Sequence, residues 1–166
     1  MVNFSASRYV FHDTHEIGTY NNFQLSEKFF PAFEKAHGDG HIACVLVDNS
    51  QGHSVYAADA LRASKMNLNP GGVQPRMRDG WYLRDGERVT QPMNFPSNHS
   101  EHPNQPKGIK AVLMERGLWR TKLLLKCKGG CREDAVDCCA QHTLECQPDF
   151  QAQKSRVQEI IEEKGE

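Results

Sequence analysis

The stretch HIACVLVDNSQGH, residues 41–53, decides which fold this sequence predicts. Its apolar centre, residues 42–47, is too short for an independent helix and is rich in valine, which is typical of a strand buried on both faces. The run ends at Asp48 and opens into a polar turn, after which Ser54 can cap a helix over residues 55–66. Strand, acid, turn and helix predict an α/β arrangement, with Asp48 at the strand end where such sheets bind their ligands.

Length and composition predict one ordinary globular domain over residues 1–166. The composition, 38% apolar and 25% charged, is that of a globular protein. A length of 166 residues suits one hydrophobic core and is too short for two. Twenty basic residues against 21 acidic ones give a formal net charge of -1, so no global field draws the chain to nucleic acid or to a membrane. The beginning lacks the apolar centre of a signal peptide, and no run of about 18 apolar residues exists to span a bilayer. We therefore expect a soluble intracellular protein with no membrane partner.

Residues 67–106 are expected to form a long insertion of loops. They hold six of the 8 prolines and several glycine-containing turn signals. Within them, residues 81–93 are expected to form a hairpin, because Asp85 and Gly86 suit a tight turn between two flanking strands.

Three further helices are expected along the chain. The first begins at Ser26, contains Pro31 as a kink and stops at Gly38. The second runs from about Lys107 to Gly117. The third has a proline in its first turn and an apolar stripe. The residues of that third helix are Pro148, Phe150, Val157, Ile160 and Ile161.

Asp48 is the best candidate for a catalytic or metal-binding side chain. A carboxylate on a rigid strand tip suits Mg²⁺, because this hard ion demands oxygen ligands in near-octahedral geometry. The alternative is that Asp48 only caps the following turn through its side chain. His53 could likewise orient a phosphate or cap the next helix.

Several motifs, in their order along the chain, resemble the catalytic region of the DDE superfamily endonucleases related to transposases. The turn contains an acid followed by Asn49, Ser50 and His53, and the similarity extends from roughly residue 18 to the end. The stretches that carry it are VLVDNSQGHSVYAADALRASKMNLNPGGVQPRMRDGW, QPMNFP, PKGIKAVLMERGLW and CCAQHTLECQPDFQAQKSRVQEIIEEKG.

This resemblance implies a partial RNase H-like fold, with a short central sheet flanked by helices. In such a fold three carboxylates hold two Mg²⁺ or Mn²⁺ ions that cleave a DNA phosphodiester. Asp48 matches the second carboxylate. The first is expected upstream of residue 1 and the third, a glutamate, beyond residue 166. The resemblance therefore implies a nuclear, transposase-derived relative that retains one catalytic carboxylate and is inactive alone.

A cysteine-rich insertion over residues 127–146 suggests a second kind of site. Clustered cysteines in a leaderless chain favour metal or reduced thiols over disulfides. Four soft ligands could hold zinc, although the spacing is not that of a standard zinc ribbon and adjacent cysteines seldom ligate one ion together. The alternative is a set of partly buried thiols. The candidate ligands are Cys127, Cys131, Cys138, Cys139 and His142.

A local basic stretch runs through residues 107–128. Its charges, with Trp119 among them, could track the phosphate backbone of DNA, or they could form a solvated helix face. The competing function is therefore a noncatalytic module that binds nucleic acid or zinc. The basic residues are Lys107, Lys110, Arg116, Arg120, Lys122, Lys126 and Lys128.

Overall fold

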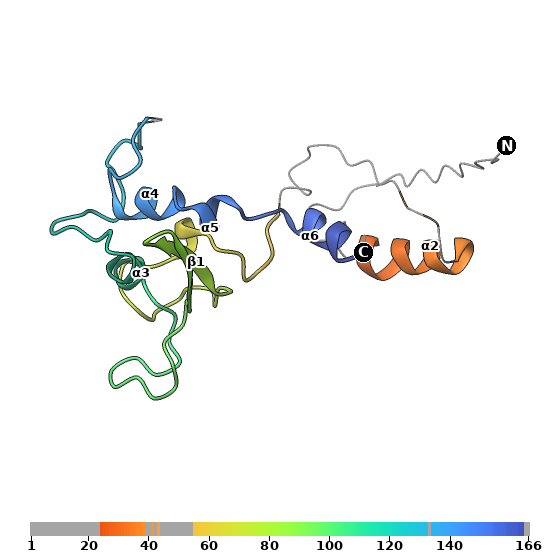
Figure 1. Ribbon diagram of the computed structural model, residues 1–166, viewed down its shortest axis with the longest axis horizontal. Helices are drawn as coiled ribbons and strands as arrows, with labels where there is room; N and C mark the ends of the chain where they lie inside the picture. The colour runs from red at the N-terminus through yellow and green to blue at the C-terminus, as the bar shows by residue number, and fades with distance from the viewer. Residues whose placement is uncertain (1–23, 39–40, 42, 44–54, 133, 165–166) are drawn as a thin grey trace. The chain divides into compact units, whose positions relative to one another are not determined.

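The structure, a computed structural model, divides the chain into two compact units. One comprises residues 56–154 and is called here the core unit; the other comprises residues 1–55 and 155–166 and is called the terminal unit. The described residues contain α-helices together with a small antiparallel sheet, so the coarse expectation of a mixed α/β chain is confirmed (Figure 1). The residues that the structure describes are 24–38, 41, 43, 55–132 and 134–164.

A two-stranded hairpin forms the sheet of the core unit. Strands β1, Gly80–Arg84, and β2, Glu87–Gln91, pair antiparallel, with Arg84 opposite Glu87 at the closed end. Asp85 and Gly86 connect the strands with φ angles of 53° and 83°. Positive φ at both positions matches the right-handed twist of the strands, and here the second position is a glycine. The hairpin and its turn are therefore confirmed.

Helix α3, Ile109–Glu115, starts against the backbone of a loop and not against a capping side chain. Gly108 is its N-cap residue, and the carbonyl groups of Asn67 and Leu68 accept the first two N–H groups of the helix at 2.9 and 3.0 Å. A Cβ atom on Gly108 would lie 2.5 Å from the Leu68 oxygen, so the loop can approach only because this residue is glycine. Gly117, with φ of 72°, follows the helix as expected.

A buried ion pair joins the end of α3 to helix α5, Pro148–Gln151. The Arg116 guanidinium donates two hydrogen bonds to the Asp149 carboxylate at 2.7 and 2.8 Å, and both side chains are 1% exposed. Asp149 also accepts the Trp81 N–H at 3.0 Å, while Arg116 Nε donates to Gln91 Oε1 at 2.7 Å. The pair thereby connects the two strands, α3 and α5 in one hydrogen-bond network.

The hydrophobic core of this unit draws on segments that are distant in sequence. Helix α3 packs against α4, Ala140–Glu145, and α5 lies against β1. Met77 and Met93 are buried in the core, so the loop-rich stretch 67–106 contributes to it directly. The buried cluster comprises Leu61, Ala63, Met66, Met77, Met93, Ile109, Val112, Leu113, Ala140, Leu144 and Phe150.

The helix expected over residues 55–66 is wrong. Regular structure in this segment is limited to η2, a 3₁₀ turn at Ala63–Lys65. The Leu61 N–H donates to a glutamine side chain 92 residues further along, at 3.0 Å. The Asp59 carbonyl accepts the Arg78 N–H at 2.8 Å. These long-range bonds occupy backbone groups that a helix would pair internally, so tertiary contacts override the local propensity.

The single C-terminal helix expected from Pro148 onward is also wrong. The chain forms α5 and then a separate helix α6, Arg156–Lys164. The Gln158 N–H donates to Ser155 Oγ at 3.3 Å, and the Ser155 N–H donates to Gln158 Oε1 at 2.9 Å. This reciprocal capping box begins a new helix. The expected apolar stripe is consequently divided between the two units.

The first expected helix is confirmed in part. A π-helical segment η1, Gln24–Phe29, continues into α2, Phe30–His37, and Gly38 ends it with φ of 68°. Pro31 lies in the first turn of α2, just after the π-helical segment passes into the α-helix. Ser26 lies inside η1, so its expected place as the N-cap is wrong.

The strand expected over residues 41–48 lies almost wholly outside the described residues, which include only His41 and Ala43 from it. The central sheet of an RNase H-like fold therefore stays a prediction. None of the described helices combines the length and the apolar character needed to cross a membrane.

Candidate metal centre

Four cysteine side chains of the core unit converge on one point. The Sγ atoms of Cys127, Cys131, Cys138 and Cys139 all lie within 4.8 Å of one another, and those of Cys131 and Cys139 are 3.7 Å apart. None of the four is in a disulfide. Zn–S bonds of about 2.3 Å in a tetrahedron separate the sulfurs by about 3.8 Å. The cluster therefore has the spacing of a four-thiolate site and could hold a metal ion such as zinc.

Backbone pairing brings the two ends of this segment together. The first two N–H groups of α4 donate to the carbonyl groups of Leu124 and Leu125 at 2.8 and 3.1 Å. Because Leu125 precedes Cys127 by two residues and Cys139 directly precedes α4, these bonds place Cys127 beside Cys139. The stretch that leads to Cys127 and the stretch that leads to Cys139 are called here the two arms of the loop. An ion pair between Arg120 and Asp137, at 3.2 Å, is a second link between these arms.

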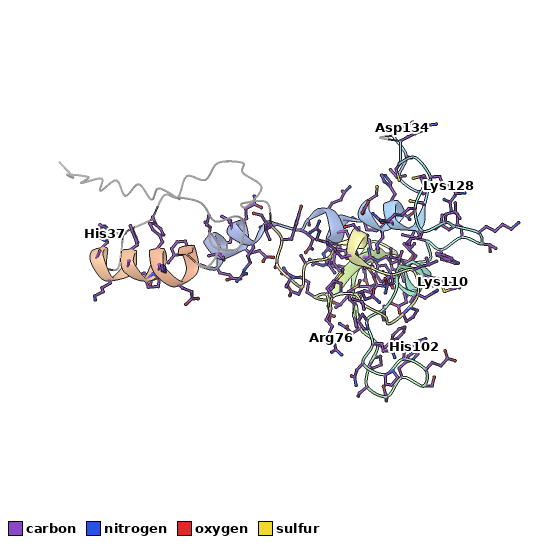
Figure 2. The ribbon with its side chains drawn as sticks, turned by 180° about the vertical axis from the view of Figure 1, so that it is seen from behind. His37, Arg76, His102, Lys110, Lys128 and Asp134 are labelled. Atoms are coloured by element: carbon purple, nitrogen blue, oxygen red, sulfur yellow. The ribbon has the colours of Figure 1, made fainter. Side chains whose placement is uncertain are left out.

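The loop between the arms turns sharply after Cys127. Gly129 and Gly130 have φ of 90° and 94°, values that glycine adopts without strain. In Figure 2, Lys128 and Asp134 lie on this loop, which projects from the body of the core unit. Two glycines thus let Cys131 return toward the other thiols.

Cys139 anchors the cluster to the core. Its side chain is 1% exposed, and it is the N-cap residue of α4. Its carbonyl accepts both the N–H and the Oγ1 hydroxyl of Thr143, at 2.9 and 2.8 Å. Cys131 is exposed, whereas Cys127 and Cys138 are half-buried. The site therefore has one rigid, buried sulfur and one that solvent reaches.

Proton sharing among the thiols shifts their pKa values. Hydrogen bonding with the Cys138 thiol raises the pKa of Cys131 to about 12, and the same contact raises the pKa of Cys127. Burial raises the pKa of Cys139, but hydrogen bonds from the His142 N–H and the Cys131 thiol outweigh it, and its pKa is lowered. Without a metal, Cys127 and Cys131 therefore keep their protons at neutral pH. A metal ion that binds to their sulfurs would release these protons.

His142 and Cys146 stand apart from the four sulfurs. Among the described residues, the group close enough to share an ion contains the four cysteines and not the His142 ring. His142 instead contributes its backbone N–H to Cys139. Burial, together with the charge of Glu145, raises the pKa of Cys146. Of the five ligands expected from sequence, the structure thus brings four together.

Two of the seven candidate DNA-binding residues are engaged inside the core unit. Lys107 is buried, and its Nζ lies 2.7 and 2.9 Å from the carboxylate oxygens of Glu115. Arg116 is the partner of Asp149, as described above. A buried cation that is paired with a carboxylate in this way is not available to a phosphate backbone.

Sequence reasoning missed Asp149, because an acid in the first turn after a proline looks like any helix start.

The other candidate basic residues lie nearer the surface. Lys110 is half-buried, with its Nζ 5.6 Å from the centre of the Trp119 ring, and Arg120 pairs with an acid. Lys122, Lys126 and Lys128 are exposed, and the last two flank Cys127 in sequence. The three lysines, called here the lysine rim, thus accompany the cysteine cluster.

The predicted catalytic motif cannot be placed. Asp48, Asn49, Ser50 and His53 all lie outside the described residues. Among the described residues, the four-cysteine group is the one set of three or more metal-ligating side chains close enough to share an ion.

Comparison of the chain with protein-family models, with curated proteins and with solved structures gave no match.

Proposed function

We propose that residues 120–146 form a zinc-binding module in which Cys127, Cys131, Cys138 and Cys139 ligate one ion as thiolates. The observation that carries this proposal is the convergence of four Sγ atoms within 4.8 Å. Soft thiolate ligands in a tetrahedron select Zn²⁺ over Mg²⁺ or Ca²⁺, which prefer oxygen.

Four protein ligands leave no open position on the ion, so the proposed role is structural and not catalytic. The metal would hold the loop after Cys127 against the start of α4. The described contacts that hold this loop include the two backbone bonds to α4, the pair of Arg120 with Asp137 and the Cys131–Cys139 sulfur contact. Metal ligation would add a stronger constraint at the far end of the loop.

Metal content tests this directly. Protein purified under reducing conditions without chelator should contain about one zinc per chain. Cobalt should substitute for zinc and give the intense sulfur-to-metal absorption of a four-thiolate site. Cys138→Ser should abolish stoichiometric binding of both ions.

Cys146→Ser is the matched control, because Cys146 lies in the same segment but outside the cluster. It should keep full metal content. Zinc-free protein from the unaltered chain, or equal loss in the two serine variants, would contradict the proposal.

We also propose that the lysine rim contacts the phosphate backbone of DNA. Support comes from three exposed lysines beside a candidate zinc loop in a chain whose net charge is only -1. Such binding should weaken steeply with salt, since each neutralised phosphate releases a counterion. The double change Lys126→Glu with Lys128→Glu should reduce both the affinity and the salt slope, whereas Lys65→Glu, at an exposed lysine in η2, should change neither comparably. Salt-independent binding would exclude this contact.

The motif order supports a further proposal, that the chain is related to the transposase-derived DDE endonucleases and has an RNase H-like fold with Asp48 as one metal-binding carboxylate. The support is sequence alone. Mg²⁺ or Mn²⁺ should then raise the unfolding temperature, and Asp48→Asn should remove the increase. An increase that survives the substitution would assign the ion to another site.

A further inference from the structure

The cysteine cluster combines accessibility with close sulfur contact, and this combination suggests a response to oxidants. Cys131 is exposed, whereas Cys139 is 1% exposed and lies 3.7 Å away, sulfur to sulfur. An oxidant in solution can therefore reach the first sulfur, and the second is in place to react with the product. A disulfide needs the two sulfurs at about 2.05 Å, so the pair must close by less than 2 Å.

The loop that carries Cys131 can make this movement. Gly129 and Gly130 precede Cys131 directly. Within residues 128–138 the structure describes one backbone hydrogen bond, which closes a turn from the Ala135 N–H to the Arg132 carbonyl at 3.2 Å. Cys139, in contrast, is fixed by Thr143 and by the core. We expect Cys131 to move toward Cys139 without disturbing α4.

We propose that the cluster is an oxidation-sensitive zinc site, in which hydrogen peroxide joins Cys131 to Cys139 and releases the metal. This inference rests on the zinc site proposed above. It adds a regulation to that site: the metal and the ordered loop would be present under reducing conditions and lost under peroxide.

The chemistry balances with peroxide as the two-electron oxidant. The Cys131 thiolate attacks one peroxide oxygen, the O–O bond breaks, and a sulfenic acid and hydroxide form. The Cys139 thiolate then attacks the sulfenic sulfur, the S–S bond forms and a second hydroxide leaves. Two thiolates have supplied two electrons and one peroxide has become two hydroxides. Zinc keeps only Cys127 and Cys138 as ligands, and two thiolates hold it too weakly against water.

The lysine rim lies in and next to the same loop. Lys126 and Lys128 flank Cys127, so loss of the ion would release them from the arrangement that the four ligands impose. Any phosphate contact of these lysines would weaken together with zinc release.

The test uses the full chain loaded with zinc and treated with hydrogen peroxide. A chromogenic chelator should report zinc release, and mass spectrometry of a non-reduced digest should show a Cys131–Cys139 disulfide appearing at the same rate. A dithiol reductant with added zinc should restore the starting state. Cys146→Ser should release zinc at the unaltered rate, because Cys146 is outside the cluster.

Cys131→His separates ligation from oxidation. Histidine can take the fourth position on zinc but cannot form the disulfide, so this variant should bind zinc and release it at least about tenfold more slowly under peroxide. If this variant does not load with zinc, the rate of disulfide formation in the unaltered chain decides.

The outcomes separate the two proposals. A chain that carries no zinc overturns both. A zinc-loaded chain that keeps its metal under peroxide, or that releases it with a disulfide other than Cys131–Cys139, overturns the regulatory inference and leaves the metal site standing.

Discussion

Arg116 and Asp149 carry the most deeply buried charges described in the core unit. Their pair is bidentate and lies among the rings of Tyr82 and Phe150, with the guanidinium carbon 5.6 and 5.4 Å from the ring centres. Removing one partner would leave the other charged and without water. Burying an unpaired ion is among the costliest changes that a core can undergo.

Asp149→Ala should therefore destabilise the chain by about 3–5 kcal/mol, measured by urea unfolding. The double variant Arg116→Met with Asp149→Leu should recover part of this loss, because no charge then remains unpaired. Recovery should be incomplete, since the N–H of Trp81 still loses its acceptor.

The matched control is an ion pair at the surface. Arg132 and Asp134 lie 2.6 Å apart but are 81% and 70% exposed. Arg132→Ala should leave the unfolding midpoint unchanged, because solvent screens such pairs. An equal loss in the buried and exposed variants would show that the buried pair has no special role.

At the scale of elements, the two ends of α3 use glycine for opposite reasons. Gly108 has an ordinary φ of -83° but no space for a Cβ, because the backbone of residues 68–69 lies against it. Gly117 has open space but a φ of 72°, which side chains disfavour. The same substitution therefore probes sterics at one end and backbone strain at the other.

Gly117→Ala should cost about 1–2 kcal/mol from the left-handed backbone alone. Overpacking a core usually costs about 1–3 kcal/mol of stability. Gly108→Ala should lie at or above the upper end of that range, because the atoms that its Cβ would meet belong to backbone and cannot rotate away. It should also expose the N–H groups of Ile109 and Lys110 to hydrogen exchange. Faster exchange at these amides in Gly117→Ala, and not in Gly108→Ala, would contradict the assignment.

The loop over residues 126–138, with the proposed zinc ligands, is the second element whose behaviour can be predicted. A chelator should raise hydrogen exchange across residues 126–138, because few described backbone bonds hold this loop. The hairpin should keep its protection, since β1 and β2 are held by the ladder and by Asp149. Loss of protection throughout the core unit would make zinc a requirement for the entire fold.

At the scale of the whole molecule, the hydrophobic cluster lies entirely within residues 56–154. The Arg116–Asp149 pair and the four cysteines belong to the same unit. A unit with its own core, its own buried ion pair and its own cysteine cluster has what an independent fold requires.

Residues 56–154, produced alone with zinc, should therefore unfold cooperatively in urea. Their amide NMR spectrum should be dispersed, as expected for a packed core. Asp149→Ala within this segment should abolish the transition or shift it strongly. A collapsed, undispersed spectrum for residues 56–154 would show that the terminal unit is needed for folding.

The sequence by itself determined the elements whose signals are local. Asp85–Gly86 predicted the hairpin turn, and Gly117 predicted the end of α3, because a tight turn and a helix end depend on the φ angles of one or two residues. The clustering of the cysteines suggested either a metal site or a set of partly buried thiols, but not which of these residues lie together. The capping box at Ser155 was also readable in the sequence, although the apolar stripe around it favoured one continuous helix.

Only the tertiary structure decided the rest. The segment 55–66 is not helical because residues far along the chain bind its backbone, and no local pattern reports such partners. The same holds for Arg116, which looked like a surface cation until its distant carboxylate was placed beside it. Four cysteines could be separated from His142 only once the pairing of Leu124–Leu125 with α4 was known. Local conformation follows from neighbouring residues, whereas partners distant in sequence are chosen by packing of the whole chain.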